Sequence, residues 1–325
     1  MKTDTAIPPT PSDRQLTGWI EAGFYVIAVA LVSIVYAMAI AAGAHVIVFI
    51  VYSLLVSATG MLIATGLGNE PLRIMMAPAS WIIGLANLVL EAAYCLMLVT
   101  ISPAEGNLIV RLAIPFAVFL GWAFFRRQPR PGVWLGALIV FIGVCGLRFT
   151  LNLSTQWMGI VYGMMSAAAI SIRGFAAEFH AWNRSARTVA DKMRVTGLVV
   201  LTNAIISMSL IVFAATLVGS GVLERNDLFP APSDLLHWPT VVYAVLVGGA
   251  IFTAMNYLQF SAVVKIRTEN LIATSAFMPV ATLIAQTLAG AAGLIVVGPF
   301  DWRLVPIMAL AVIGVLILIK SQKPG

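Results

Sequence analysis

The chain alternates between long apolar runs and short polar breaks along its whole length. A helix needs about 20 apolar residues to span a bilayer, and windows of that length predict ten helices. Their approximate ranges are 18–42, 46–66, 79–101, 104–125, 132–150, 156–179, 194–219, 239–263, 269–292 and 302–319. The breaks carry turn and charge signals, as in Arg126-Arg127-Gln128-Pro129. The pattern therefore predicts an all-α membrane protein with ten transmembrane helices.

Composition supports a membrane protein and argues against other classes. Hydrophobic residues make up 61% of the 325 positions and charged residues only 10%, against roughly 25% charged in soluble domains. A soluble domain of this size could not hide so much apolar surface, whereas lipid accepts it. The formal charge of +6 does not indicate a nucleic-acid partner, because the basic residues lie in the gaps between apolar runs.

The sequence predicts neither a cleaved leader nor a metal or cofactor site. Residues 1–17 are polar and proline-rich and predict a cytoplasmic tail, followed by a first apolar run that is retained as a helix. The two cysteines, Cys95 and Cys145, lie inside apolar runs. The three histidines do not have ligand spacing, and we expect them at membrane interfaces.

Basic residues predict the orientation of the chain. Cytoplasmic loops of membrane proteins are enriched in Lys and Arg. With the N-terminus inside, fourteen basic residues fall on the cytoplasmic side: Lys2, Arg14, Arg73, Arg126, Arg127, Arg130, Arg184, Arg187, Lys192, Arg194, Lys265, Arg267, Lys320 and Lys323. Only three fall on the other side: Arg148, Arg225 and Arg303. The bias predicts a multi-pass protein of the inner (cytoplasmic) membrane with both termini in the cytoplasm.

A glutamate and a proline recur at one spacing in the two halves. Glu105 precedes Pro115 by ten residues, and Glu269 precedes Pro279 by the same distance. The repeat divides the chain after its tail into units 18–150 and 151–325. Each unit has five helices, an odd number, so the two units have inverted topology around a central cavity. The two prolines break a helical hydrogen bond each, and they predict either a gating hinge or a static kink.

Short motifs in both halves resemble the EamA-type domain of the drug/metabolite transporter superfamily. They are Ser102-Pro103-Ala104-Glu105, Ile114-Pro115-Phe116 and Phe141-Ile142-Gly143-Val144, then Gly248-Gly249-Ala250, Met278-Pro279-Val280 and Val312-Ile313-Gly314-Val315. Where the family usually has Gly-Glu after its fourth helix, this chain has Arg126-Arg127-Gln128. The resemblance implies ten helices in two five-helix units around a cavity, and transport of metabolites with export favoured.

Two charged residues stand well inside predicted helices and are the main site candidates. An intramembrane charge costs about 2.5–3.5 kcal/mol on insertion scales. Arg111 could neutralise a substrate carboxylate or phosphate, and Glu91 could receive an amine or a proton. Alternatively, the two side chains could pair with each other and hold two helices together.

The remaining candidates are polar or aromatic. Substrate-binding roles are predicted for Tyr94, Asn107, Tyr162, Arg173, Asn256, Tyr257 and Ser275. Arg173 could equally extend to the cytoplasmic interface along its aliphatic stem. Glu105 and Glu269 are expected to cap the helices that they begin.

We expect a secondary transporter of a small organic metabolite, amino-acid-like or amphipathic, and not an enzyme. An intramembrane lipid-modifying enzyme would need converging catalytic groups, and no such motif is present. A non-transporting partner subunit is the other alternative. The absence of a Walker motif argues against ATP hydrolysis. Coupling to protons and a homodimer are both compatible with this architecture.

Overall fold

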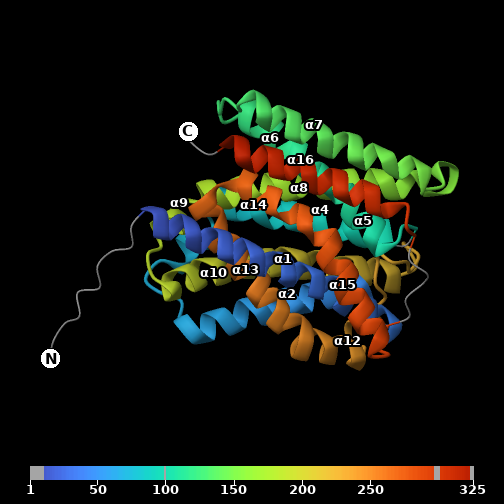
Figure 1. Ribbon diagram of the computed structural model, residues 1–325. Coiled ribbons are helices and arrows are strands. Elements are labelled where there is room, and N and C mark those ends of the chain that lie inside the picture. The colour runs from blue at the N-terminus through green and yellow to red at the C-terminus, as the bar shows by residue number, and fades with distance from the viewer. Residues whose placement is uncertain (1–10, 99, 296–300, 323–325) are drawn as a thin grey trace.

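The computed structural model describes residues 11–98, 100–295 and 301–322. Within these ranges every regular element is a helix. The helices lie alongside one another in a single bundle (Figure 1). Most of the predicted tail, together with Lys2 and Lys323, lies outside the described residues.

The first half of the chain contributes seven α-helices and two short 3₁₀ turns. They are α1 (Pro11–Ala41), α2 (Val46–Thr65), α3 (Pro71–Met75), α4 (Pro78–Leu98), α5 (Pro103–Ile109), η1 (Val110–Leu112), α6 (Ala113–Ala123), α7 (Pro131–Cys145) and η2 (Gly146–Phe149).

The second half follows a similar order. Its elements are α8 (Leu153–Phe179), α9 (Ala181–Ser185), α10 (Val189–Gly219), α11 (Pro232–Leu235), α12 (Trp238–Tyr243), the π-helical η3 (Ala244–Gly248), α13 (Gly249–Ile266), α14 (Thr268–Thr274), η4 (Ser275–Phe277), α15 (Met278–Ala291) and α16 (Leu304–Gln322).

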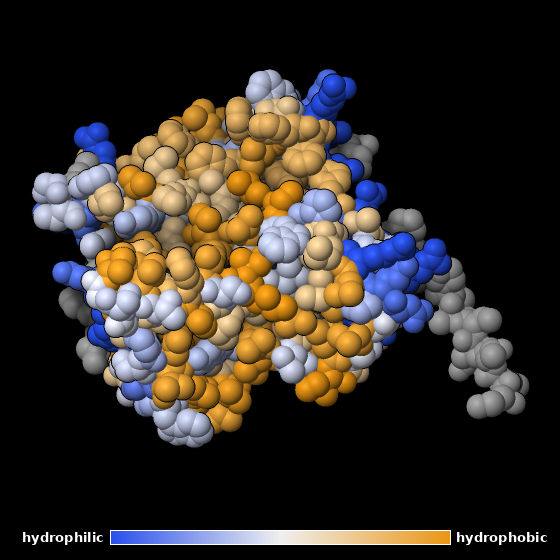
Figure 2. Space-filling view, turned by 180° about the vertical axis from the view of Figure 1, so that it is seen from behind, coloured by the Kyte–Doolittle hydropathy of each residue, from blue (hydrophilic) through white to orange (hydrophobic). Residues whose placement is uncertain are grey.

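The described residues include nine helices that are long and apolar enough to cross a membrane. A tenth results if Trp238–Leu246 and Gly249–Ile266, which meet at an angle of 45°, form one bent span. The surface agrees with lipid contact. Large apolar side chains such as Ile63, Phe213 and Leu288 are 82%, 62% and 66% exposed. Figure 2 shows apolar residues across the middle of one face and hydrophilic residues gathered toward its two sides. The protein is therefore a helical protein embedded in a membrane.

Two helix boundaries differ from the hydropathy prediction. Helix α1 begins at Pro11 instead of residue 18, and α10 begins at Val189 instead of residue 194. Thr188 caps α10, because its hydroxyl accepts a hydrogen bond from the Asp191 N–H at 3.1 Å. Polar residues cost little where a helix extends beyond the hydrocarbon, so hydropathy underestimates the length of both helices.

The main helix contacts join the two halves of the chain. Helix α7 packs on α16, α2 on α10, α4 on α8, and α1 on α13. The first of these contacts is very close, since a Cβ atom added at Gly136 would lie only 2.4 Å from the carbonyl oxygen of Gly314. The described chain begins with α1 and finishes with α16 at one end of the bundle, which we call the terminal end; α5 and α12 begin at the opposite end (Figure 1).

Candidate functional site

A buried cavity lies in the middle of the bundle. Six segments line it: α1, α4, α5 with η1, α8, α13, and α14 with η4 and α15. Its volume is about 80 Å³, measured as the space open to the centre of a water-sized sphere. That is more than the 10–15 Å³ a single water needs, but less than the roughly 300–1,000 Å³ of sites for drug-sized ligands. The cavity admits a few waters in this conformation, and a metabolite requires the helices to separate.

Arg111 lies in η1 and is among the largest fully buried side chains. Its Nε donates to the Asn107 carbonyl at 2.8 Å, and one terminal nitrogen donates to the Ser275 carbonyl. The Ser275 carbonyl also accepts the Met278 N–H of its 3₁₀ turn, and Pro279 leaves its second lone pair open. Proline has no N–H, so the carbonyl four residues earlier, that of Ser275, lacks its usual helical donor. The repeat-related proline therefore leaves this carbonyl open to the arginine from the other half of the chain.

Arg173 lies on α8 and is only 2% exposed, so it does not extend to an interface. It lines the cavity and donates through one terminal nitrogen to the side-chain oxygen of Asn87 on α4. Its Nε atom is buried without a hydrogen-bond partner. Of the two placements that the sequence allowed for Arg173, the structure has the cavity-facing one.

Glu91 lies on α4 and also lines the cavity. Its carboxylate accepts a hydrogen bond of 2.7 Å from the Tyr36 hydroxyl of α1. In the part of the chain that the structure describes, no ion pair within 4.0 Å joins Glu91 to Arg111. The alternative in which these two residues hold each other is therefore wrong for this conformation.

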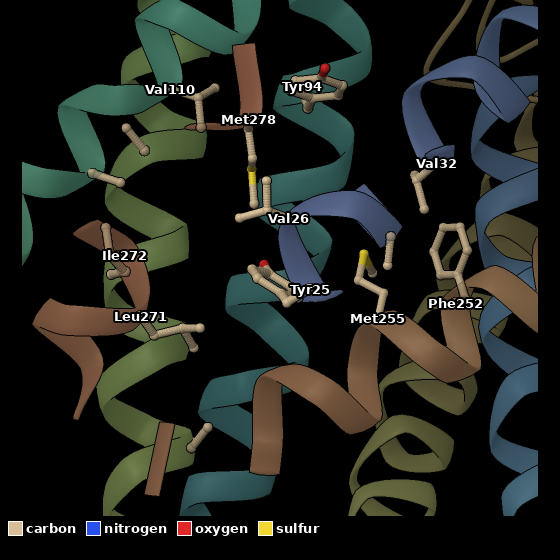
Figure 3. Packing of buried hydrophobic residues seen from close by; sticks show 14 of the residues in the cluster. Tyr25, Val26, Val32, Tyr94, Val110, Phe252, Met255, Leu271, Ile272 and Met278 are labelled. Carbon is tan, nitrogen blue, oxygen red and sulfur yellow. The ribbon is translucent and has the colours of Figure 1, made fainter. Parts of the chain in front are cut away.

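The rest of the wall is mostly apolar. Figure 3 shows Tyr25, Met255 and Met278 reaching from three different helices toward the centre, with Leu271 and Ile272 along one side. Thioether and phenol groups adapt to amphipathic ligands better than branched aliphatic chains do.

The structure brings six of the predicted binding residues together at the cavity. They are Glu91, Tyr94, Asn107, Arg111, Arg173 and Ser275. Tyr162 is not among them. It lies eleven residues before Arg173 on α8, roughly 16 Å along the helix axis, and lines a separate hollow with Ala92 and Met165.

Asn256 and Tyr257 also lie outside the cavity lining. Met255 and Gln259, one turn apart on α13, face the cavity. The two intervening candidates are rotated away by about 100° and 200°. Asn256 instead donates to the Phe252 carbonyl at 2.9 Å.

Four polar residues of the cavity lining were not predicted from the sequence as binding residues: Tyr25, Ser33, Tyr36 and Gln259. The first three belong to α1, whose apolar run is hydrophobic on all sides. Val29, Val32, Ser33 and Tyr36 repeat at helical intervals on one face, but in an apolar run this spacing does not show which face is inside.

The two prolines occupy similar places. Pro115 is the third residue of α6 and Pro279 the second of α15, and each follows a 3₁₀ turn that interrupts its helix. Both helices are therefore broken near the cavity, as the repeat predicted. Their gating role stays a prediction.

Toward the terminal end, a cluster of charged side chains lies beside the cavity segments. Arg127 forms ion pairs with Glu178 of α8 and Glu269 of α14. Glu178 also accepts hydrogen bonds from the N–H and the hydroxyl of Thr268, at 2.9 and 2.6 Å. We call Arg127, Glu178, Thr268 and Glu269 the terminal clamp. It joins the segment after α6 to two helices of the second half.

Local structure positions Arg127 in this clamp. Arg126 has a φ of +51°, and this turn lets the Arg127 N–H donate back to the Gly121 carbonyl at 3.0 Å. The guanidinium lies 5.4 and 5.5 Å from the ring centres of Phe175 and Phe179, within cation–π range.

Neither Glu105 nor Glu269 caps its helix through its own carboxylate, and at α5 the cap is Ser102. Ser102 accepts the Glu105 N–H at 3.4 Å and donates to the Glu105 carboxylate at 2.6 Å, which forms a cap at the start of α5. Glu269 is in the first turn of α14, but its carboxylate binds Arg127 instead of a backbone amide.

His180, expected at an interface, is completely buried. Its ring contacts the Ser80 hydroxyl at 3.0 Å and accepts the Asn183 N–H at 3.3 Å, which caps α9. Lys192 donates to the Asn183 carbonyl at 2.5 Å. Burial lowers the pKa of His180 to about 4, so the ring is neutral near pH 7.

No group of three or more His, Cys, Asp or Glu side chains within the described ranges could hold a metal ion.

Comparison with known proteins supports the fold alone. No family model matches the chain, and no curated protein does. Several solved structures match. One of them, described as "Crystal structure of protein", has a TM-score of 0.61 and 17% sequence identity, over 97% of this chain and 100% of the other.

Proposed function

We propose that this protein is a secondary transporter that carries a small organic metabolite, amino-acid-like or amphipathic, across the inner membrane by alternating access. The observation that carries this proposal is the cavity, in which Arg111, Arg173 and Glu91 face one buried space. Intramembrane ionisable residues are costly and typically mark solute pathways. A bundle with a purely structural role would be as stable or more stable with apolar side chains at these positions.

The transporter would consist of ten helices in two inverted five-helix units, with the bent α12–α13 pair as one span. The packing supports this arrangement. We pair α1 with α8, α2 with α10, α4 with α13, α6 with α15 and α7 with α16. Under this exchange the α4–α8 contact becomes α13–α1, α6–α8 becomes α15–α1, and α4–α10 becomes α13–α2, and all of these contacts are present.

The cavity lining supports the same relation. Arg111 and Ser275, which hydrogen-bond to each other, are separated by the same number of residues as Pro115 and Pro279. The lining positions of α1 and α8 also share one spacing: Val29, Val32 and Ser33 in one helix, Ile170, Arg173 and Gly174 in the other. Equivalent positions meet at the centre, where inverted-repeat transporters bind their substrates.

In this proposal the terminal end faces the cytoplasm, following the excess of basic residues on that side. The terminal clamp would then close the cytoplasmic entrance in this conformation. Opening it, and closing the opposite end in turn, would expose the cavity alternately. The resemblance to EamA-type exporters favours export.

Flux into sealed proteoliposomes tests the proposal. Purified protein is reconstituted and uptake of a panel of radiolabelled metabolites is measured, with protein-free liposomes as the blank. We expect saturable flux of at least one unmodified solute, and loss of that flux in Arg111→Gln. Conversion of the solute would instead indicate an enzyme. Absence of protein-dependent flux for the whole panel would contradict the proposal.

A further inference from the structure

The cavity carries an imbalance of charge. Its lining contains two arginines, Arg111 and Arg173, and a single carboxylate, Glu91. All three side chains are buried, with exposures of 2%, 2% and 8%. Across the described part of the chain, none of them belongs to an ion pair within 4.0 Å. One positive charge therefore has no counter-charge in the cavity wall.

The two guanidinium groups are also incompletely hydrogen-bonded. Arg111 binds two backbone carbonyls, and its remaining terminal nitrogen meets only the Met278 sulfur at 3.5 Å, a weak acceptor. Arg173 has one amide acceptor, and its Nε has no partner. These groups face the cavity and can bind an occupant that the wall itself does not supply.

We propose that the solute is an organic monoanion, a carboxylate without an ammonium group of its own, bound between Arg111 and Arg173. This inference rests on the proposed transport function. A monoanion neutralises the excess positive charge, whereas a zwitterion leaves it and a cation adds to it. Charge-assisted hydrogen bonds from guanidinium to carboxylate are the strong ones in such a setting.

Glu91 sets the upper limit on negative charge. Tyr36 holds its carboxylate on the same cavity, so a second negative group on the solute meets repulsion. The apolar wall of Tyr25, Met255 and Met278 fits an aromatic or aliphatic body. The two arginines come from different halves of the chain, so binding one carboxylate between them would draw the two proposed units together.

Four phenyl-bearing probes that differ in charge test the charge class. They are 3-phenylpropanoate (anion), phenylalanine (zwitterion), 2-phenylethylamine (cation) and 3-phenylpropan-1-ol (neutral). The thermal shift of the purified protein is titrated with each probe, because a ligand stabilises the fold according to its affinity. We expect the largest shift with the anion. Arg111→Gln and Arg173→Gln should each weaken its binding by about 10- to 100-fold. Arg148→Gln removes an exposed charge outside the cavity lining and should leave the binding of the anion unchanged.

A variant that is expected to bind the anion more tightly separates a change in the site from a failure to fold. Glu91→Gln should strengthen 3-phenylpropanoate binding and admit the dianion benzylsuccinate, which the natural protein should reject. An equal or larger shift with phenylalanine, the amine or the alcohol, or no shift with any of the four, would overturn the anion assignment. So would weaker binding of the anion in Glu91→Gln. The liposome flux assay decides separately whether the protein is a carrier.

Discussion

The starts of α5 and α14 have related sequences and opposite surroundings. At the start of α5, Ser102 and Glu105 bond to each other at the exposed edge of the bundle. At the start of α14, Thr268 and Glu269 bond to Glu178 and Arg127, in two other segments. One turn completes its own hydrogen bonds, and the other depends on side chains distant in sequence.

This difference shows how one local sequence pattern can serve two mechanical roles. A self-contained cap can move with its helix without breaking contacts elsewhere. The terminal clamp cannot, because any separation of α14 from α8 exposes carboxylates that are only 12% exposed. In the proposed transporter, the clamp is therefore one contact that must break to open the terminal end.

Arg127→Gln should have the largest effect. It leaves Glu178 and Glu269 without their cation, and removing one partner of a mostly buried ion pair costs about 2–4 kcal/mol. We expect a lower melting temperature in detergent and greater access of water-soluble thiol reagents to a cysteine at Ser275. Arg126→Gln is the matched control, because Arg126 is the next residue along the chain and its side chain is exposed. Equal melting temperatures for both variants would show that the ion pairs of Arg127 do not stabilise the terminal end.

Substituting the two repeat-related glutamates sharpens the comparison. Glu269→Gln weakens an ion pair and should cost about 1–2 kcal/mol, in proportion to its partial burial. Glu105→Gln should be nearly silent, because glutamine also serves in a capping box. The measurement is denaturation of both variants under one condition. Equal losses would mean that the two turns do not differ in the way described.

The two prolines should differ in the same sense. Pro279→Ala restores an N–H that competes with Arg111 for the Ser275 carbonyl, so we expect several-fold slower flux in the liposome assay. Pro115→Ala adds an N–H that takes no acceptor from a cavity arginine, and it should slow flux less. A larger defect in Pro115→Ala would show that bending at the helix break matters more than the placement of Arg111.

Acidification should also weaken the terminal end. The unfolded chain binds a proton at His180 below about pH 6.5, while burial keeps the folded pKa near 4. Because the unfolded state then binds more protons, stability falls as pH drops from 6.5 to 4, and this contribution is constant above 6.5. The melting temperature of His180→Asn, which retains a capping residue, should decline less over that interval. Parallel pH profiles would contradict this assignment.

Much of the fold follows from the sequence because lipid imposes a simple rule. Each apolar run of sufficient length became a helix, and only the bent α12–α13 pair leaves the number of spans at nine or ten. Helix ends were less predictable. At α1 and α10 the helix continues into polar residues, where hydropathy carries no information and capping groups such as Thr188 decide the boundary.

The charged residues of the candidate site could be predicted from the sequence. Arg111, Arg173 and Glu91 stand out because each is costly in hydrocarbon. Tyr36 does not, because a tyrosine in a uniformly apolar helix gives no sign of which face it occupies. Tyr257 lies outside the cavity lining because two residues along a helix reverse the direction of a side chain, and only the packed neighbours define the inner face.

Cysteine accessibility tests the central claim of alternating access most directly. Ser275, buried at the cavity, is replaced by cysteine in a chain with Cys95→Ala and Cys145→Ala. A membrane-impermeant maleimide is then applied to sealed right-side-out and inside-out vesicles. We predict labelling from both faces. A solute that favours one conformation should slow labelling from one face and speed it from the other. Labelling from one face only, or from neither while the denatured protein reacts fully, would contradict the account.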